Sequence, residues 1–323
     1  MADQSKPQIP PLLGIAFGIL VVSTSSIVIR FAQQDAPSQV IAAWRLTLAS
    51  LVLVPLLMRS ERRTLRELTR SQVGLGLASG VFLALHFVTW IASLEHTTVA
   101  SSVVLVSTIP LFMAALSPLT LHEPITRPVL AGMLLATVGS ISIGLSDICH
   151  WQAGLHCGGT TSAAGGPLVG DLLALAGALA GAGYFLIGRR LRADLSLLSY
   201  IGLSYSTAAV VLLLLVLVSG QPLLAYPPIT YLWFAFLALG PQLLGHSSFN
   251  WALRFLPAAF VGITLLGEPV GSTILAALLL DERPSVVKAL SMMLTLAGIY
   301  LASRATTRPS SPGLAEAPGR DAP

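Results

Sequence analysis

Residues 265–282 read LLGEPVGSTILAALLLDE and place Glu268 and Pro269 inside an otherwise apolar run. In a soluble protein a Glu-Pro pair would indicate a loop. The composition indicates a different solvent, because hydrophobic residues make up 54% of the 323 residues and charged residues only 10%, whereas an ordinary globular chain carries about 25% charged residues. The mean hydropathy is +0.80. The stretch is therefore predicted to lie in a lipid bilayer.

Apolar windows of this kind recur ten times along the chain, and each has the ~20 residues that a helix needs to cross a hydrocarbon core of roughly 30 Å. Lipid offers the backbone no hydrogen-bond partners, so each window is predicted to be a helix; the short alternating strands of a membrane barrel are absent from the sequence. The first window follows Lys6 and ends without a small-residue cleavage motif, so we expect it to be retained and not removed as a signal peptide. The predicted spans lie at 11–31, 38–58, 72–93, 97–119, 126–146, 168–188, 197–218, 229–250, 257–280 and 285–303.

Two connections of the predicted bundle are rich in arginine. Residues 59–70 contain five arginines and residues 189–192 contain three, which places both connections in the cytoplasm by the positive-inside rule. The connections at 33–37 and 219–228 contain no Lys or Arg and are predicted to lie outside. An even number of spans then puts both termini in the cytoplasm. The net charge of +4 is thus a topology signal, and no nucleic-acid partner is expected because no basic patch is interleaved with aromatic residues.

The chain also contains an internal repeat. A shift of 159 residues aligns rare residue types in one register, namely Gly18 with Gly177, Arg30 with Arg189, Asp35 with Asp194, Pro110 with Pro269, Glu123 with Glu282, and Gly139 with Gly298. Because each unit holds five helices, an odd number, the second unit must be inverted in the membrane. The predicted fold is an all-α membrane protein of ten transmembrane helices in two inverted five-helix repeats, an architecture that recurs in transporters. Its predicted parts are an N-terminal cytoplasmic tail (1–10), a first repeat (11–146), an outer connecting loop (147–166), a second repeat (167–303) and a disordered cytoplasmic tail (304–323).

The repeat-related prolines, Pro110 and Pro269, point to the centre of the molecule. Each lacks an N–H and frees the carbonyl four residues earlier, at Val106 and Leu265, which predicts that the fourth and ninth spans are broken by a kink near their centres. Freed carbonyls at bilayer depth are tolerated where they line a cavity, and paired interruptions at the repeat interface indicate a substrate site. The alternative is that the prolines only shape helix packing.

The spacing of these residues resembles that of a known family. Each proline stands thirteen residues before a glutamate (Glu123, Glu282) and a glycine follows sixteen further on in both repeats, while Arg45 lies in AAWRLTLA of the second span. The pattern, over residues 11–303, resembles the EamA family of the drug/metabolite transporter superfamily. The resemblance implies a ten-helix carrier of the bacterial inner membrane that moves small metabolites, often outward. Arg45 departs from the symmetry, because Ser204 occupies the matching position.

Few ionisable side chains fall within the predicted spans, and each is a candidate site residue because burying a charge in the membrane is costly. Glu268 is the sharpest candidate: on a continuous helix Thr264 and Ser272 lie one turn to either side, which would suit a cation, an amine or a proton that Glu268 takes up and releases. The alternative is that Glu268 only hydrogen-bonds a neighbouring helix.

His86 and His246 match in the two repeats at a shift of 160, and each has a polar or aromatic neighbour one turn on, Trp90 and Asn250. They either surround the substrate or are buried neutral histidines with a backbone partner. Arg45 keeps its proton and can neutralise Glu268, hold a substrate carboxylate, or extend toward the outer headgroups.

The outer loop contains CHWQAGLHC at 149–157, with two cysteines and two histidines. Cys149 and Cys157 are the only cysteines of the chain and are predicted to face the oxidising side, so we favour a disulfide over a metal site. No cofactor is expected.

Known catalytic motifs do not occur. The sequence has no GxxxxGK[ST] loop for ATP and neither HExxH nor GxSxG. The sequence therefore predicts a secondary transporter and not an enzyme, most simply an exporter of a small polar or amphipathic metabolite such as an amino acid, with protons as a possible coupling ion. The alternatives are a membrane-embedded enzyme acting on lipid or peptide, for which a histidine and Ser247 would have to serve, and a passive channel. The pattern favours no particular oligomeric state.

Overall fold

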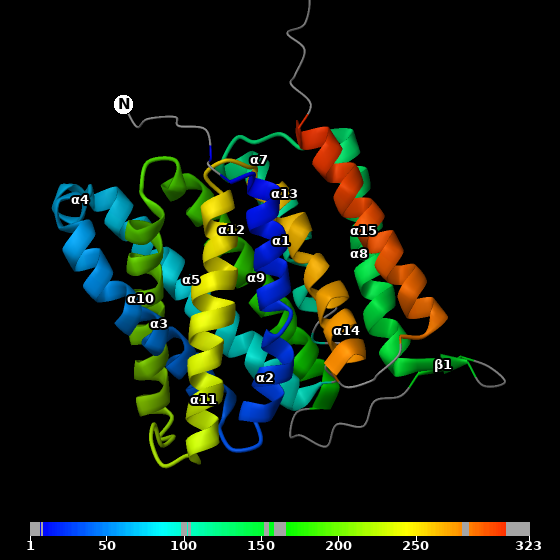
Figure 1. Ribbon diagram of the computed structural model, residues 1–323, viewed down its shortest axis with the longest axis horizontal. Coiled ribbons are helices and arrows are strands. Elements are labelled where there is room, and N and C mark those ends of the chain that lie inside the picture. Colours follow the sequence, from blue (N-terminus) through cyan, green and yellow to red (C-terminus); the bar gives the residue numbers. More distant parts are fainter. Residues whose placement is uncertain are drawn as a thin grey trace, which may run out of the picture.

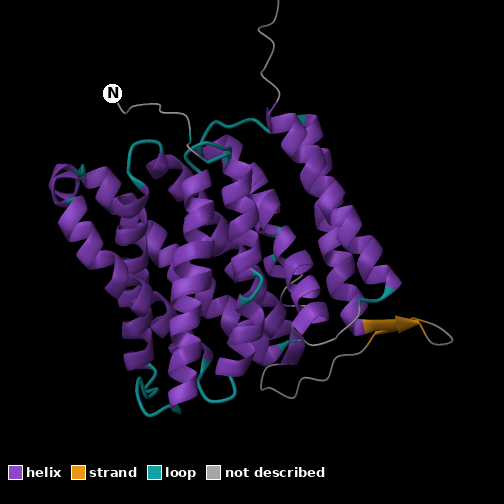
Figure 2. Cartoon of the chain, viewed as in Figure 1, coloured by secondary structure: helices purple, strands orange, loops and turns teal. Residues whose placement is uncertain are grey.

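The computed structural model describes residues 7, 9–97, 102, 105–151, 155–157, 166–279 and 284–307. Helices make up nearly all of this part of the chain, with one short hairpin outside the bundle (Figure 2). Most of both predicted tails and Glu282 lie outside the described residues, so the expectations made for them stay predictions.

The first half of the chain begins with a span in two pieces, α1 and α2, and continues through long helices with a short surface helix between two of them. Thr69 begins α5 with a capping box, in which its side chain and that of Gln72 each accept a backbone N–H of the other residue. The helices are α1 (Pro11–Val22), α2 (Ser25–Ala32), α3 (Ser38–Ser60), α4 (Arg62–Glu67), α5 (Arg70–His96), α7 (Ile109–Thr120) and α8 (Arg127–Ile148).

The second half repeats this order after the hairpin of β1 (Cys149–Trp151) and β2 (Leu155–Cys157). Ser196 caps the second of its long helices by accepting the N–H of Ser199. The helices are α9 (Gly166–Arg192), α10 (Leu197–Val218), α11 (Pro228–Leu237), the π-helical η1 (Ala238–His246), α12 (Ser247–Ala252), α13 (Ala258–Leu265), α14 (Gly267–Leu279) and α15 (Val286–Thr307).

The helices have the length and composition of membrane spans. Within the described residues, seven helical segments are long and apolar enough to cross a bilayer, and three shorter apolar helices, Ile109–Thr120, Arg127–Ser142 and Val286–Ala302, fall where the fourth, fifth and tenth spans are predicted. Large apolar side chains such as Leu51, Val218 and Leu278 point away from the bundle. Such extensive apolar exposure is rare on soluble monomers, and it fits a surface covered by lipid.

The two ends of the bundle differ. The start of α1, the end of α15, the arginine-rich α4 and the end of α9 all lie at one end of the bundle, drawn uppermost in Figure 1, and the β1–β2 hairpin lies at the other. We call these the arginine-rich end and the hairpin end. Both arginine clusters of the sequence thus lie on one side, as the positive-inside rule requires.

The main helix contacts between the two halves have counterparts made by the corresponding helices of the other half. Helix α5 of the first half packs along α9 of the second half, and α11–η1–α12, the repeat counterpart of α5, packs along α1 and α2, the counterpart of α9. The remaining counterparts contact each other: α3 packs against α10, α7 against α13 and α8 against α15. The glycines related by the repeat make equivalent contacts. A Cβ added to Gly177 of α9 would lie 3.0 Å from Thr89 of α5, and one added to Gly18 of α1 would lie 3.1 Å from Ser248 of α12. Small residues allow such close helix approach in membranes.

Candidate functional site

Three spans are interrupted at the same depth in the bundle. The first breaks at Ser23 and Thr24 between α1 and α2, another at Leu266 between α13 and α14, and α7 begins only at Ile109, after a turn. Pro110 and Pro269 both stand in the first turn of the helix that follows the break. A missing N–H costs nothing there, because the first-turn N–H groups have no partner within the helix. The prolines therefore start helices α7 and α14 and do not bend a continuous one.

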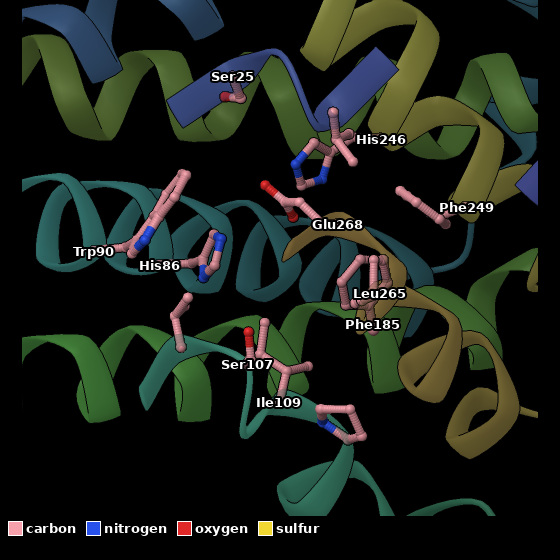
Figure 3. Close-up of a pocket in the computed structure, with 13 residues that line it drawn as sticks. Ser25, His86, Trp90, Ser107, Ile109, Phe185, His246, Phe249, Leu265 and Glu268 are labelled. Atoms are coloured by element: carbon pink, nitrogen blue, oxygen red, sulfur yellow. The ribbon is translucent and has the colours of Figure 1, made fainter. Parts of the chain in front are cut away.

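A cavity lies at these breaks (Figure 3). Its polar wall consists of Ser25, His86, Trp90, Ser107, His246 and Glu268, and its apolar wall of Val22, Val106, Ile109, Pro110, Phe185, Phe249 and Leu265. Both residues whose carbonyls the prolines were predicted to free, Val106 and Leu265, are among them. Repeat-related positions line the cavity in pairs, since Val106 matches Leu265, Ile109 matches Glu268 and Trp90 matches Phe249 at the shift of 159. The cavity thus lies where the two halves meet.

Glu268 is the acidic residue of the cavity. It stands in the first turn of α14, where the helix dipole favours a negative charge. Ser23 Oγ donates to the Glu268 carbonyl at 3.2 Å, and Ser272 Oγ donates to the Ser23 carbonyl at 2.9 Å, so α14 is fastened to the break of the first span. The carboxylate points into the cavity between the two imidazoles (Figure 3). No ion pair within 4.0 Å involves Glu268 in the part of the chain that the structure describes.

The two histidines approach the cavity in different ways. His86 is buried and its Nδ1 donates to the Gly177 carbonyl at 2.8 Å, which leaves Nε2 of the neutral ring as an acceptor. Its ring stacks on Trp90 with centroids 6.0 Å apart. His246 ends the π-helical segment, a feature common at functional sites, and contacts the rings of Phe87, Phe185 and Phe249. His246 Nδ1 and Trp90 Nε1 are buried without a hydrogen-bond partner among the described residues.

Arg45 lies behind the cavity wall. Only 1% of its surface is exposed, so it does not extend to the headgroups. Its Nε donates to Gln242 Oε1 at 2.9 Å and a terminal nitrogen to Ser25 Oγ at 3.0 Å, while the guanidinium carbon lies 4.2 Å from the centre of the Phe87 ring. Arg45 interacts electrostatically with Glu268 without forming a direct pair. It therefore positions the Ser25 hydroxyl and sets the local charge.

Three other predicted site residues do not line the cavity. Thr264 donates to the Val261 carbonyl of its own helix, and Ser272 donates to the break of the first span. The expected polar stripe assumed a continuous helix through Glu268, and the break at Leu266 removes that regularity. Asn250 donates to Tyr184 and Tyr205 in a buried tyrosine cluster.

Ser25, Ser107, Phe185 and Phe249 line the cavity but were not predicted. The repeat could have indicated Phe249, because it matches Trp90. Ser25 belongs to the polar run STSS at 23–26 within an apolar span, a signal that could have identified it. Phe185 carries no signal in the sequence, since one aromatic residue in an apolar helix is ordinary.

The hairpin brings the two cysteines together in the backbone. Cys149 pairs with Cys157 directly across the antiparallel ladder, a spacing that suits a disulfide. The structure describes only the backbone at these two positions, so the disulfide stays a prediction.

The apolar helix bundle and its central polar cavity at the junction of two similar halves define a membrane protein of the transporter class. The EamA-like transporter family matches the chain twice, at residues 10–145 and 168–304. The chain belongs to this family, and the prediction from residue spacing is confirmed.

Relatives and a solved structure agree. The uncharacterized transporter YetK of Bacillus subtilis (strain 168) is 25% identical over 301 residues, covering 92% of this chain and 87% of its own. The uncharacterized transporter YyaM of the same organism is 26% identical over 270 residues, covering 81% of this chain and 83% of its own. One crystal structure, 17% identical with a TM-score of 0.72, covers 92% of this chain and 99% of that one and shows the same fold.

Proposed function

We propose that the protein is a secondary transporter of the bacterial inner membrane that exports a small polar or amphipathic metabolite, such as an amino acid. The observation that carries this proposal is the cavity lined by repeat-related residues of both halves, with Glu268 in its wall. A binding site at the interface of two halves is the arrangement that alternating access uses.

We further propose ten spans in two inverted repeats with both termini in the cytoplasm. The two family matches, at 10–145 and 168–304, support two repeats that lie close to the predicted units at 11–146 and 167–303. The opposite directions of α1 and α9 in Figure 1 support the inversion, since α1 starts at the arginine-rich end and α9 ends there. The shared location of the α1 start, the α15 end and both arginine clusters supports the orientation.

The polar groups of the cavity suggest which parts of a substrate they would hold. The Glu268 carboxylate suits an ammonium group. Trp90 Nε1 can only donate a hydrogen bond and has no described partner, so it suits a carboxylate or carbonyl oxygen of the substrate. His246 Nδ1 also has no described partner and could bind the same group of the substrate. Phe185 and Phe249 suit an apolar side chain. A compound with an amine, an acceptor group and a compact apolar part would satisfy all three.

Proton coupling is part of the proposal. A cavity carboxylate without an ion-pair partner can take up a proton when substrate leaves and release it when substrate binds. Arg45, which Gln242 and Ser25 hold behind the wall, is the positive charge near this carboxylate.

The enzyme alternative has little support from the geometry. Catalysis by nucleophilic attack needs a nucleophile within hydrogen-bond reach of a base. Ser247 Oγ contacts Tyr205 and the Gln242 carbonyl, and among the described residues no hydrogen bond joins a serine side chain to His86 or His246.

The test is a ligand screen on purified protein in detergent. Thermal unfolding is followed against amino acids, amines, nucleosides and organic acids at two pH values, because a ligand that binds the native state raises the midpoint. We expect a zwitterionic amine to raise the midpoint of the wild type and of Glu67→Gln, a matched control at an exposed surface pair, but not of Glu268→Gln.

Transport of the same compound in proteoliposomes provides the second measurement. Wild-type flux with unchanged pH dependence in Glu268→Gln would remove Glu268 from the mechanism. A ligand shift that persists in Glu268→Gln at the same concentrations would place the binding site elsewhere.

A further inference from the structure

An ion pair joins the two halves at the arginine-rich end. Arg189 Nε lies 2.6 Å from Glu123 Oε1, and each side chain is 24% exposed. Glu123 belongs to the connection between α7 and α8 in the first half, and Arg189 to the last turn of α9 in the second. This is one of two ion pairs found among the described residues, and the other, Arg63–Glu67, lies within one exposed helix.

The pair also caps two further helices of the second half. Glu123 Oε2 accepts the N–H of Ala258, the first residue of α13, at 3.1 Å. A terminal nitrogen of Arg189 donates to the carbonyls of Leu253 at 2.7 Å and Arg254 at 3.3 Å, just past the end of α12. A negative charge at a helix N-terminus and a positive charge at a helix C-terminus are both favourable. Four segments therefore meet at two side chains.

The same segments lead directly to the cavity. On α9, Phe185 of the cavity wall precedes Arg189 by one turn. Helix α13 runs from Ala258, which Glu123 caps, to Leu265 of the cavity wall. Helix α7 has Pro110 of the cavity wall in its first turn and ends just before Glu123. The ion pair thus lies at the outer ends of α7 and α13, whose inner ends line the cavity, and one turn beyond Phe185 on α9.

Between the cavity and the ion pair, α7 and α13 are in close contact. A Cβ added to Gly262 would lie 2.7 Å from Met113 Sδ and 3.4 Å from Pro110 Cα, and Met113 is 0% exposed. A close apolar contact of Met113 with Gly262 therefore lies between the cavity and the ion pair.

We propose that the Arg189–Glu123 pair is a gate that holds the arginine-rich end closed in this structure and breaks when the cavity opens to that side. The proposal rests on the proposed transport function, which requires the cavity to reach both sides in turn. A partly exposed ion pair is suited to this task, because its net stabilisation is small and water can replace either partner. Breaking it releases α13 from the α7–α8 connection and lets the Met113–Gly262 contact separate.

The test measures access to the cavity and needs no substrate. Ser107, in the cavity wall, is replaced by cysteine, and its reaction with a membrane-impermeant maleimide is followed in inverted membrane vesicles, which expose the cytoplasmic side. The chain with Ser107 intact gives the background from Cys149 and Cys157. Glu123→Gln, Arg189→Gln and their double variant are compared with Arg190→Gln, which removes an equal charge from an exposed neighbour.

We expect Glu123→Gln and Arg189→Gln each to raise the labelling rate roughly three- to tenfold, as fits the loss of one partly exposed pair with its capping bonds. The double variant should label no faster than the faster single variant, because both remove the same interaction. Arg190→Gln should label like the Ser107→Cys chain that carries no second substitution. Arg189→Lys, which keeps the charge but loses the planar fork, should be intermediate and remains available if Arg189→Gln does not fold.

Unchanged labelling in both single variants, or an equal increase in Arg190→Gln, would overturn the gate. Because labelling needs no ligand, this result is distinct from a failure of the transport proposal, which would appear as absent binding and flux while the labelling pattern persists.

Discussion

Replacing Gly298 by alanine is expected to push α8 and α15 apart. The added Cβ would lie 2.4 Å from Ala136 N, 2.6 Å from Gly132 O and 2.8 Å from Ala136 Cα. All three are backbone atoms of α8, so no side chain can move aside. An ordinary contact begins at 3.4 Å, and the helices must therefore separate by about 1 Å, a gap that forfeits roughly a quarter to a half of each dispersion contact it opens.

The magnitude follows from two opposing effects. Overpacking a close contact costs about 1–3 kcal/mol, and alanine recovers up to about 1 kcal/mol through its better helix propensity. We expect a net destabilisation of about 1–2 kcal/mol. The matched control is Gly74→Ala in α5, where the added Cβ meets no atom within 4 Å; this variant should be as stable as the wild type or slightly more stable.

The assay is thermal unfolding of the purified variants in one detergent. The midpoint of Gly298→Ala should fall by several degrees, since about 1 kcal/mol shifts a chain of this size by roughly 2–4 °C. The reasoning is refuted if Gly298→Ala matches the wild type, because α8 and α15 would then not be in backbone contact at this position. An equal fall in Gly74→Ala would show that the loss comes from alanine itself and not from the contact.

Three further predictions concern the cavity and the hairpin. Gly181→Ala would place a Cβ 2.9 Å from His86 Nδ1, which displaces the imidazole from its carbonyl partner. Ligand affinity in the thermal-shift assay should fall roughly tenfold or less, the value of one hydrogen bond, and the ligand-free midpoint should also fall because a buried contact is overpacked. An unaltered affinity would place His86 outside the site. Arg45→Lys should retain partial transport and Arg45→Met should lose it, because lysine keeps the charge while methionine keeps only the volume; equal flux in both variants would show that the charge is dispensable. Cys149 and Cys157 should resist alkylation before reduction and react afterwards, with a mass gain of two alkyl groups, and full alkylation without a reductant would contradict the disulfide.

The sequence alone predicted the membrane-spanning segments and their order along the chain. Hydrophobicity acts residue by residue through transfer from water to lipid, so the apolar windows and the arginine-rich connections indicated a bundle of membrane helices and the side on which those connections lie. The repeat register, read from rare residues such as Pro110 and Pro269, pointed to the region of the cavity, which Pro110 lines. Glu268, His86 and His246 were recognisable because polar side chains are costly in a bilayer.

The tertiary structure decided which side chains face one another. Arg45 and Asn250 are as polar as the cavity residues, yet the rotation of their helices directs them to Gln242 and to the tyrosine cluster. The pairing of Glu123 with Arg189 joins residues 66 positions apart, and both read as ordinary charges at helix ends. Hydropathy depends on residue type and neighbours in sequence, whereas helix rotation, the place where a span breaks and contacts across the repeat interface depend on how all the helices pack together.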